Sequence, residues 1–548
     1  MSRPRFVNLR DAVAPIPDGA LLSFGGFDLQ RPPLALATEL VRQEKKRLRV
    51  VVPPAPLPLD LLVGAGVVEE AEFGFIGFQY EEGFVVAPNV RRAIESGGIA
   101  WRERDVFEIV QGLRAAAAGV EFLPAPGGEG TDYERYWPAA RARIDSNGTK
   151  SSAPGAKPGA IAPAIRPDFV LLHAQEADRH GNLYLADPYF DDLLARAGEH
   201  VIATVERIVD RIPHASIPLT RVSAIVEARA GAYPGGCHGH YRHDVSGLRA
   251  WEESAKAGRF PEHVEALIRN RAEHAVRLVA GVTAGVAAPV EAAPAAPTAA
   301  AVAAPRTVQA ADRLIVGMAR RIQDGDVVVT GLASALPMLA VAVARATHAP
   351  RLTYINCVGA VDPEVTAALP TSVDPRLLDS AVARLVVSDF FDMARRGRID
   401  VMFFGAAQVD AASRLNLSFI GDPLRPKVKL PGPAGSTSIR PFVRKVVVLV
   451  PRHAPRVLVD RVDFASSVPS DRNRETWVVS DLALLRLEER RLVVASRHAG
   501  TSGETLRSRT GFALPDAEAA PVTDEPTDAE RDAIERLDPH GLRHRLAG

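Results

Sequence analysis

One cysteine and two nearby acids have the types and spacing for covalent chemistry. Cys357 follows the apolar stretch 353–356, and a thiol can accept an acyl group. Asp362 and Glu364 lie further along the same loop, and the proline after Asp362 favours an extended or turn conformation there. A buried thiol is also a common packing residue, and a loop acid is commonly solvated. Both alternatives stay open at this level.

Small residues follow three predicted strands. Gly25-Gly26 precedes Phe27-Asp28, Gly331 takes the matching place in the second half, and Gly405-Ala406-Ala407-Gln408 follows an apolar run. Glycine lets a backbone approach a ligand closely and offer N–H donors. Open α/β sheets bind ligands at such strand ends. Each glycine alone is equally consistent with a plain turn, so the prediction of a binding site depends on the paired placement.

Metal and phosphate motifs are weak or absent. The segment 237–244, CHGHYRHD, holds Cys237, His238, His240 and His243 at spacings that zinc can use. His173 and His180 lie elsewhere in the chain. No Walker A, dinucleotide G-x-G-x-x-G or G-x-S-x-G pattern occurs, and the glycine-rich PGGEG at 126–130 lacks the Lys-Ser/Thr of a phosphate loop.

The elements that must position these residues occur twice. PIPDGALLSFGGF and RIQDGDVVVTGLA each read as an Asp-Gly turn, a short strand and a glycine loop, followed by proline and a helix. HAQEADRHGNLYL (173–185) and GAAQVDAASRLNLSF (405–419) form a second matching pair. Such units build parallel α/β sheets. We therefore predict two similar open α/β domains with largely parallel sheets, packed as a pseudo-dimer.

Local patterns place the elements within each half. Val/Ile/Leu-rich runs predict strands covered on both faces, at 48–53, 168–174, 200–206, 400–408 and 444–451. Helices are expected at 34–47, 262–279 and 334–347. The stretch 145–165 is expected to be a turn-rich loop, and the C-terminal tail to hold a short charged helix with Thr527 as its N-cap.

The bulk composition bounds the protein class. An Ala/Pro-rich segment at 281–308 predicts a semi-extended linker between domains 1–280 and 309–548. The 548 residues balance 66 basic against 66 acidic side chains, which argues against a nucleic-acid partner. Two cysteines exclude a disulfide framework. No apolar run has the length of a signal or membrane segment, so a soluble cytoplasmic protein with no membrane partner is expected.

Several stretches together resemble the glutaconate branch of the class I coenzyme A (CoA) transferases. They occur in the order of that family's α and then β subunit, as if fused, and cover all but the linker and the tail. The stretches are FGGFDLQRPP, VAPNVRRAIESGGI, EADRHGN, VIATVERIV, VVTGLASALP, FFGAAQVD, IGDPLRPKVKLPGPAG, WVVSDLALLRLEE and TGFALP. The resemblance implies the CoA-transferase (NagB/RpiA-like) fold, acyl-CoA and a carboxylic acid as substrates, no permanently bound cofactor and no metal. A homo-oligomer of the fused chain is left open.

The family's chemistry implies a specific site. A β-subunit glutamate attacks the thioester and forms an anhydride, then an enzyme–CoA thioester. Aligned on Gly359, the position of this glutamate is Cys357, which cannot form the anhydride. Asp362 or Glu364 would have to substitute for it. The resemblance implies that the CoA pocket lies between the halves, lined by Gly25, Gly26, Gly331, Cys357, Gly359, Gly405, Ala406 and Gln408.

A narrower resemblance keeps other functions open. DPYFDDLLARAGEHVIATVERIV (187–209) and DPHGLRHR (538–545) resemble the actinobacterial steroid-ring CoA hydrolases. An important glutamate of those enzymes aligns with Val106, and Glu108 is the nearest substitute; a solvated helix face is the alternative for Glu108. A CoA transferase acting on acyl-CoA is the leading prediction. A CoA-dependent hydrolase and a non-catalytic acyl-CoA-binding protein are the alternatives.

Overall fold

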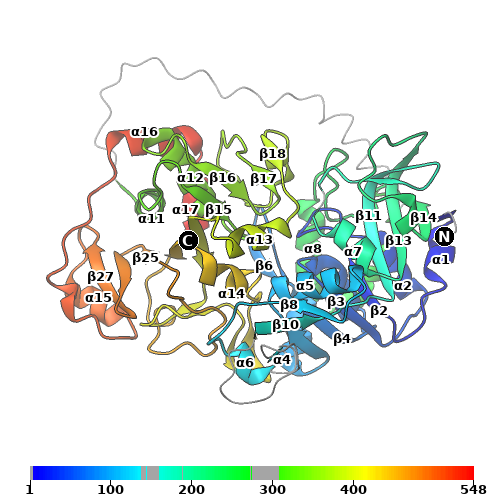
Figure 1. The fold of residues 1–548 in the computed structure, drawn as a ribbon, viewed down its shortest axis with the longest axis horizontal. Coiled ribbons are helices and arrows are strands. Elements are labelled where there is room, and N and C mark those ends of the chain that lie inside the picture. The colour runs from blue at the N-terminus through cyan, green and yellow to red at the C-terminus, as the bar shows by residue number, and fades with distance from the viewer. Residues whose placement is uncertain are drawn as a thin grey trace.

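The computed structural model describes residues 4–137, 143–144, 159–187, 189–271, 273–274 and 308–547. Two α/β halves lie side by side in Figure 1, the first on the right in blue to green and the second on the left in yellow-green to red. Each half is built on a nine-stranded sheet. Both sheets are largely parallel, which confirms the predicted fold class.

The first sheet is parallel throughout, apart from the short β12 (Leu183–Tyr184) that pairs with β11. Its order is β1 (Arg5–Phe6), β14 (Ala224–Glu227), β13 (His200–Val209), β11 (Phe169–Asp178), β2 (Leu21–Phe24), β3 (Leu48–Val52), β4 (Val68–Phe73) and β7 (Ala100–Glu103). Two small antiparallel sheets accompany it: β5 (Gly77–Tyr80) with β6 (Gly83–Val86), and β8 (Phe122–Pro124) and β9 (Arg143–Ile144) with β10 (Gly159–Pro163).

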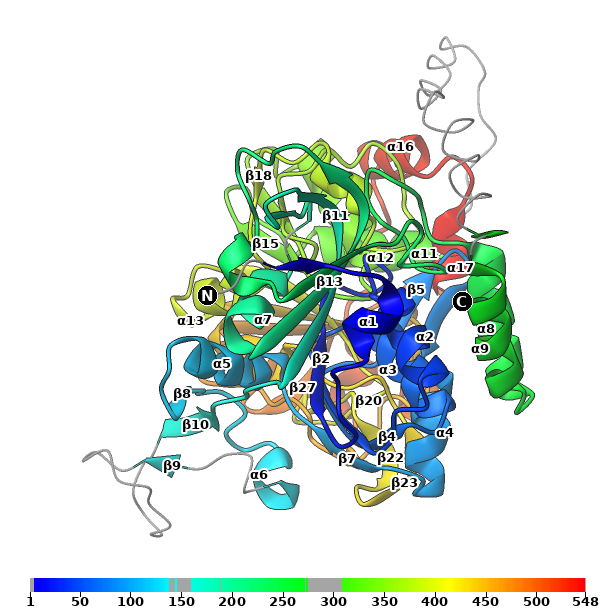
Figure 2. The ribbon, with the colours of Figure 1, turned by 90° about the vertical axis from the view of Figure 1, so that its right-hand side faces the viewer.

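Helices cover both faces of the first sheet (Figure 2). One face packs against α1 (Leu9–Val13), α2 (Leu34–Arg42), α3 (Pro56–Gly64), α4 (Pro88–Ser96), α8 (Val245–Lys256) and α9 (Phe260–Arg269). The other packs against α5 (Val106–Ala117) and α7 (Asp191–Ala197), and it shares a continuous apolar core with the second half. The short α6 (Tyr133–Tyr136) lies beyond β8. Burial on both faces explains the near-continuous apolar runs of these strands.

The second sheet is parallel in its centre and antiparallel at both edges. Its order is β18 (Ala383–Arg384), β17 (Ala360–Val361), β16 (Thr353–Asn356), β15 (Val327–Thr330), β19 (Val401–Gly405), β24 (Lys445–Val450), β25 (Glu475–Ser480), β26 (Ala483–Glu488) and β27 (Arg491–Arg497). Two hairpins accompany it, β20 (Gln408–Val409) with β21 (Leu415–Asn416) and β22 (Phe419–Asp422) with β23 (Arg425–Lys429). Its helices are α11 (Ala310–Ala319), α12 (Ala335–Thr347), α13 (Asp389–Arg395), α14 (Ser436–Ile439), α15 (Gly503–Arg509), α16 (Asp528–Leu537) and α17 (Leu542–Ala547).

Matching turns explain why the two halves resemble each other in sequence. Gly19 and Gly325 both adopt positive φ, +77° and +87°, directly before the first strand of each unit. Asp178 in the first half accepts backbone N–H bonds from residues 180–182, and Asp410 accepts them from residues 412 and 414. Each acid thus closes the turn after a strand through its side chain.

Polar contacts between the halves, some of them buried, accompany the shared core. The guanidinium of Arg114 donates two bonds of 2.9 Å to the carboxylate of Asp392. Lys429 pairs with Glu103, and both side chains are fully buried. The hydroxyl of Ser438 donates to Asp105 at 2.5 Å. The interface is therefore both apolar and charge-matched.

The structure corrects some local expectations. The predicted loop 145–165 ends in strand β10, because residues 161–163 pair with β8. The predicted helices 34–47 and 262–279 correspond to α2 and α9, which end at Arg42 and Arg269. Thr527 caps α16 as predicted, in a capping box with Glu530. Of the predicted linker, residues 281–307 lie outside the described residues, so the linker and the domain boundaries stay predictions. None of the described helices combines the length and hydrophobicity needed to cross a bilayer.

Candidate active site

A cavity of about 120 Å³ lies between the halves, at the carboxyl ends of parallel strands. Strand β15 ends beside it at Thr330, and β16 leads into it at Cys357. The first half lines it with Phe27, Pro54, Phe75, Val106 and Phe190. The second half lines it with Val329, Thr330, Gly331, Leu332, Ser334, Cys357, Val387, Phe390, Phe391, Met402, Phe403, Phe404, Gly405, Leu417, Gly432, Pro433, Ala434, Gly435, Ser436 and Ile439.

Cys357 is a buried thiol in the wall of this cavity, 6% exposed. Its Sγ lies 3.7 Å from the carbonyl oxygen of Ser372, to which the S–H donates. Burial raises the pKa of the thiol well above its ordinary value, and the nearby carboxyl of Asp28 raises it further. The group is therefore a neutral thiol near neutral pH and not a thiolate nucleophile.

Asp28 is a buried acid next to the cavity, although its own side chain does not line it. It is 3% exposed and follows Phe27, which lines the cavity. Burial raises the pKa of its carboxyl to about 8, although backbone N–H groups of Leu29 and Gln79 bond to it. Its Oδ2 accepts no hydrogen bond from any residue that the structure describes. A group with this pKa can act as either acid or base near neutrality.

The backbone at Asp28 is strained, and a buried ion cluster holds the loop in place. Asp28 and Arg31 have φ of +53° and +52°, which non-glycine residues rarely adopt. The Arg31 guanidinium pairs with Asp187 at 2.6 Å and with Asp191 at 2.9 Å, all fully buried. Asp191 also accepts the N–H of Gly26 at 3.1 Å. Strain of this kind persists where the surroundings over-determine the backbone, and it concentrates at functional sites.

Gly25 and Gly26 lie in the loop that the ion cluster holds, and their binding role stays a prediction. Their N–H groups are already used, since Gly25 donates to the carbonyl of Leu171 at 3.0 Å and Gly26 to Asp191. A Cβ on Gly25 would lie 2.3 Å from Asp191 Oδ1. Neither glycine lines the cavity. Gly25 makes room for Asp191 of the ion cluster, and Gly26 makes room for the backbone of Gln30 and Arg31.

The predicted small residues of the second half divide into two groups. Gly331 and Gly405 line the cavity, and a Cβ on either would meet nothing closer than 3.8 Å. Gly359 and Ala406 do not line it; a Cβ on Gly359, which has φ of +90°, would lie 2.1 Å from the carbonyl oxygen of Leu385. Gln408 is turned into the protein, where its Oε1 accepts bonds from Asn416 and Asp463. Binding roles for these residues stay predictions.

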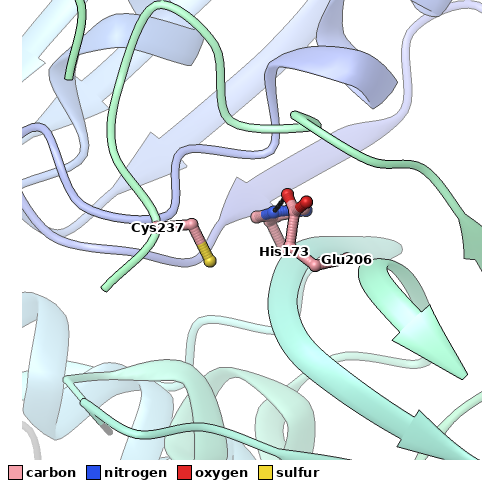
Figure 3. A group of neighbouring side chains, drawn as sticks. All are labelled: His173, Glu206 and Cys237. Carbon is pink, nitrogen blue, oxygen red and sulfur yellow. Dashed lines mark hydrogen bonds and ion pairs between the residues drawn. The ribbon is translucent and has the colours of Figure 1, made fainter. Parts of the chain in front are cut away.

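Histidine and cysteine side chains gather at a second place, in the first half. His173, Glu206 and Cys237 offer ligand atoms within 4.8 Å of one another, all buried (Figure 3). His173 Nε2 and Glu206 Oε1 are hydrogen-bonded at 2.8 Å, and the Tyr241 hydroxyl donates to the same oxygen. Burial would raise the pKa of Glu206, but these bonds outweigh it and lower the pKa. These contacts form a hydrogen-bond network in which His173 and Glu206 both have partners.

The histidines of segment 237–244 do not gather into one set of metal ligands. His238 Nε2 lies 2.9 Å from Asp379 of the second half, and His243 Nε2 lies 2.7 Å from Glu81. Burial lowers the pKa of His240 below its ordinary value. The predicted zinc alternative built from Cys237, His238, His240 and His243 is therefore wrong, because two of these residues bind separate acids.

Comparison with known proteins assigns the fold to a family. The coenzyme A transferase family matches residues 6–228 and 312–502, one region in each half. This chain belongs to the coenzyme A transferase family. The two matched regions fit the predicted fusion of two subunits.

Individual relatives cover one half or the whole chain. The IpdA subunit of the cholesterol ring-cleaving hydrolase of Rhodococcus jostii strain RHA1 is 35% identical over 265 residues, 46% of this chain and 88% of its own. The decarboxylase AibA/AibB is 44% identical over 44% of this chain and 99% of its own, with a TM-score of 0.42. The acyl-CoA transferase YdiF of Escherichia coli O157:H7, in a thioester complex with CoA, is 16% identical over 99% of this chain and 97% of its own, with a TM-score of 0.64.

The acids predicted to replace the family's glutamate lie elsewhere. Strand β17 turns back on β16, so Asp362 returns to Tyr354, whose N–H it accepts at 2.8 Å, and pairs with Arg345. Glu364 is exposed, and neither residue lines the cavity. Asp362 and Glu364 therefore do not occupy the place beside Cys357.

Glu108 is also excluded from the cavity wall. Val106, the first residue of α5, lines the cavity. Glu108 lies two residues further on, about 200° around the helix axis, and is buried on another side. Both family positions for a carboxylate, at 357 and 106, thus carry uncharged side chains. Sequence comparison missed Asp28, although the Gly-Gly-Phe before it was the available signal.

Proposed function

We propose that this member of the coenzyme A transferase family transfers CoA between carboxylic acids, with Asp28 as the acyl-accepting carboxylate. The observation that carries the proposal is the buried Asp28 carboxyl, whose Oδ2 accepts no hydrogen bond from any described residue and which directly follows Phe27 of the cavity wall. No acid other than Asp28 has a resolved effect on the pKa of the Cys357 thiol. CoA and acyl-CoA are then substrates, with no permanently bound cofactor. The cytoplasm, which keeps both buried cysteines reduced, is the proposed compartment.

In the proposed cycle, each bond that forms is matched by a bond that breaks. An oxygen of ionised Asp28 attacks the thioester carbon, the C–S bond breaks, and the CoA thiolate leaves an acyl-aspartyl anhydride. The thiolate attacks the aspartyl carbon and releases the acyl group as a carboxylate. The resulting aspartyl–CoA thioester is attacked by the acceptor carboxylate, and the same two steps in reverse deliver CoA to the acceptor.

A second candidate function is decarboxylation of a CoA-bound acid. The neutral Cys357 thiol, an Asp28 that holds its proton up to about pH 8 and the uncharged cavity wall favour this candidate. An uncharged wall disfavours a substrate carboxylate more than the neutral product. Loss of CO₂ would leave the electron pair on a carbon conjugated with the thioester, and Asp28 would supply the proton to that carbon.

One experiment separates these functions. The purified full chain is incubated with butyryl-CoA, with and without acetate, and separately with glutaconyl-CoA and malonyl-CoA, and the products are measured by mass spectrometry. Acetyl-CoA formed only with acetate supports transfer, whereas loss of CO₂ supports decarboxylation. Free acid and CoA without acetate would identify a hydrolase, and binding without turnover a non-catalytic protein.

A covalent trap tests the role of Asp28 directly. Transfer through Asp28 predicts an aspartyl–CoA thioester that borohydride reduces, leaving a modification at residue 28 and a dead enzyme. Asp28→Asn should abolish both. The matched control is Asp516→Asn, which changes an exposed acid on the turn Pro515–Ala517. A thioester at another residue would overturn the assignment of Asp28.

A further inference from the structure

We infer that the cavity selects a short, branched or cyclic, uncharged acyl group, with Ser436 binding its carbonyl oxygen. This inference rests on the proposed function in taking an acyl-CoA as the ligand, and it adds the class of acyl group. It follows from three observations: the charge of the cavity wall, its volume, and one unpartnered hydroxyl.

The wall of the cavity carries no charge. Among the described residues that line it, none is Asp, Glu, Lys, Arg or His. Phenylalanines approach from both halves, including Phe27 and Phe190 on one side and Phe390 and Phe391 on the other. A second carboxylate on the acyl group would enter this wall without a counter-ion, at a large desolvation cost. The wall therefore disfavours a dicarboxylic acyl group.

The volume limits the size of the acyl group. Apolar protein cavities of about 150 Å³ stay dry and bind benzene. The present cavity, at about 120 Å³, is somewhat smaller, so the part of the acyl group beyond the thioester carbonyl should have at most about six carbon atoms. A long fatty-acyl chain does not fit without moving the wall. The compact lining favours a branched or cyclic group, which fills such a volume better than an extended chain does.

One hydroxyl in the wall has no partner. Ser436 is 5% exposed, and its Oγ forms no hydrogen bond with any described residue. Its backbone is fixed, because its N–H donates to Pro433 and its carbonyl accepts from Ser467. A buried hydroxyl left without a partner is costly, and an acyl thioester brings one neutral acceptor, its carbonyl oxygen. Because Ser436 lines the cavity, an acyl carbonyl oxygen bound beside it would supply the acceptor that this hydroxyl lacks.

Binding to the intact protein, measured by isothermal titration calorimetry, tests the inference. The probes are isobutyryl-CoA, benzoyl-CoA, glutaryl-CoA and dodecanoyl-CoA. We expect isobutyryl-CoA and benzoyl-CoA to bind about 100-fold more tightly than glutaryl-CoA. Dodecanoyl-CoA should bind more weakly than isobutyryl-CoA, because its chain exceeds the volume of the cavity. Ser436→Ala should weaken isobutyryl-CoA about 5- to 10-fold.

Gly331→Ala provides a size test with a matched control. The added methyl group would project into the cavity 3.8 Å from Met402 Cε, so it fills space without a clash. It should weaken benzoyl-CoA at least about 10-fold and isobutyryl-CoA less. Gly98→Ala, which adds a methyl group at an exposed site with ordinary contacts, should change neither affinity.

The outcomes separate this inference from the proposed function. Binding of glutaryl-CoA or dodecanoyl-CoA as tight as that of isobutyryl-CoA would overturn the inference alone. Equal loss of benzoyl-CoA and isobutyryl-CoA in Gly331→Ala would also count against the size limit. Failure of all four acyl-CoA probes to bind would overturn the proposed function as well.

Discussion

Burial raises the pKa of the Cys357 thiol in the second half, and the carboxyl of Asp28 in the first half raises it further. Each half supplies only one of these two groups, so the interaction requires both halves. Asp28 is positioned by a strained loop and Cys357 by the end of a central strand. The reactive groups of the site are therefore set by the way the two halves pack.

The pH dependence of turnover should distinguish the two candidate functions. Transfer needs the ionised form of Asp28, whose pKa is about 8, so kcat for transfer should rise about tenfold per pH unit below 8 and level off above it. Proton donation needs the neutral form, so kcat for decarboxylation should fall above pH 8. Steady-state rates between pH 6 and 10 measure this. A flat profile for both reactions would remove Asp28 from the chemistry.

Asp28→Asn should stabilise the protein in alkaline solution. The folded-state pKa of about 8 exceeds the ordinary value of 3.8, so the unfolded chain releases this proton first as pH rises. The free energy of unfolding thus loses several kcal/mol between about pH 4 and pH 8, and the loss is constant above. Asparagine at position 28 does not ionise, so the variant does not lose this part of the free energy of unfolding. The difference in thermal midpoint between variant and wild type should grow from pH 5 to pH 8, and equal differences would contradict the prediction.

Moving the carboxylate to the family position should rescue the enzyme. Asp28→Asn alone should have no transfer activity, and Cys357→Glu alone should gain little because two carboxyls then share one buried site and one stays protonated. The double variant Asp28→Asn/Cys357→Glu should recover transfer to at least about a tenth of wild-type kcat, since one carboxylate again faces the thioester. Transfer that persists in Asp28→Asn and is absent from the double variant would refute this exchange.

Gly359→Ala should be much more harmful than a comparable glycine substitution. The new methyl group would lie 2.1 Å from the backbone oxygen of Leu385, in addition to the strain of a positive φ. We expect a loss of about 2–5 kcal/mol in the free energy of unfolding. Gly397→Ala also has positive φ, with nothing within 4 Å of the added carbon, and should cost about 1–2 kcal/mol. Urea unfolding compares them, and equal losses would argue against the clash.

The buried ion pair between Lys429 and Glu103 should depend on both partners. Burial lowers the pKa of Lys429, which Glu103 opposes. Lys429→Met leaves a buried carboxylate unpaired and should cost about 3–5 kcal/mol. The double variant Lys429→Met/Glu103→Gln keeps an acceptor for the hydroxyl of Tyr133 and should regain most of that loss. Thermal unfolding checks this, and additive losses would show that the two residues do not act as a pair.

Much of the fold follows from local sequence patterns. The matched Asp-Gly turns at 18–19 and 324–325 and the apolar runs between them and the helices predict the repeated unit, because turn geometry and burial are local properties. Helix ends were less predictable. The pattern of α2 continues past Arg42, but Glu44 and Arg47 adopt positive φ and end the helix.

The site was predicted only in part, because its decisive contacts join distant segments. Gly331, Cys357 and Gly405 follow strands of one sheet, and strand ends indicate where ligands bind. Asp28 becomes significant only once folding buries its carboxyl. The binding role of Gln408 stays a prediction, and its side chain turns inward to Asn416. Burial of this kind depends on three-dimensional packing that spacing along the chain does not record.

The fully buried Lys429–Glu103 pair also makes the fit between the two halves depend on charge. A half carrying Glu103 that met a counterpart without a cation at position 429 would bury an unanswered negative charge, at a cost of several kcal/mol. The pair thus rejects mismatched assemblies by electrostatic exclusion, and joining the two halves in one chain adds proximity to that discrimination.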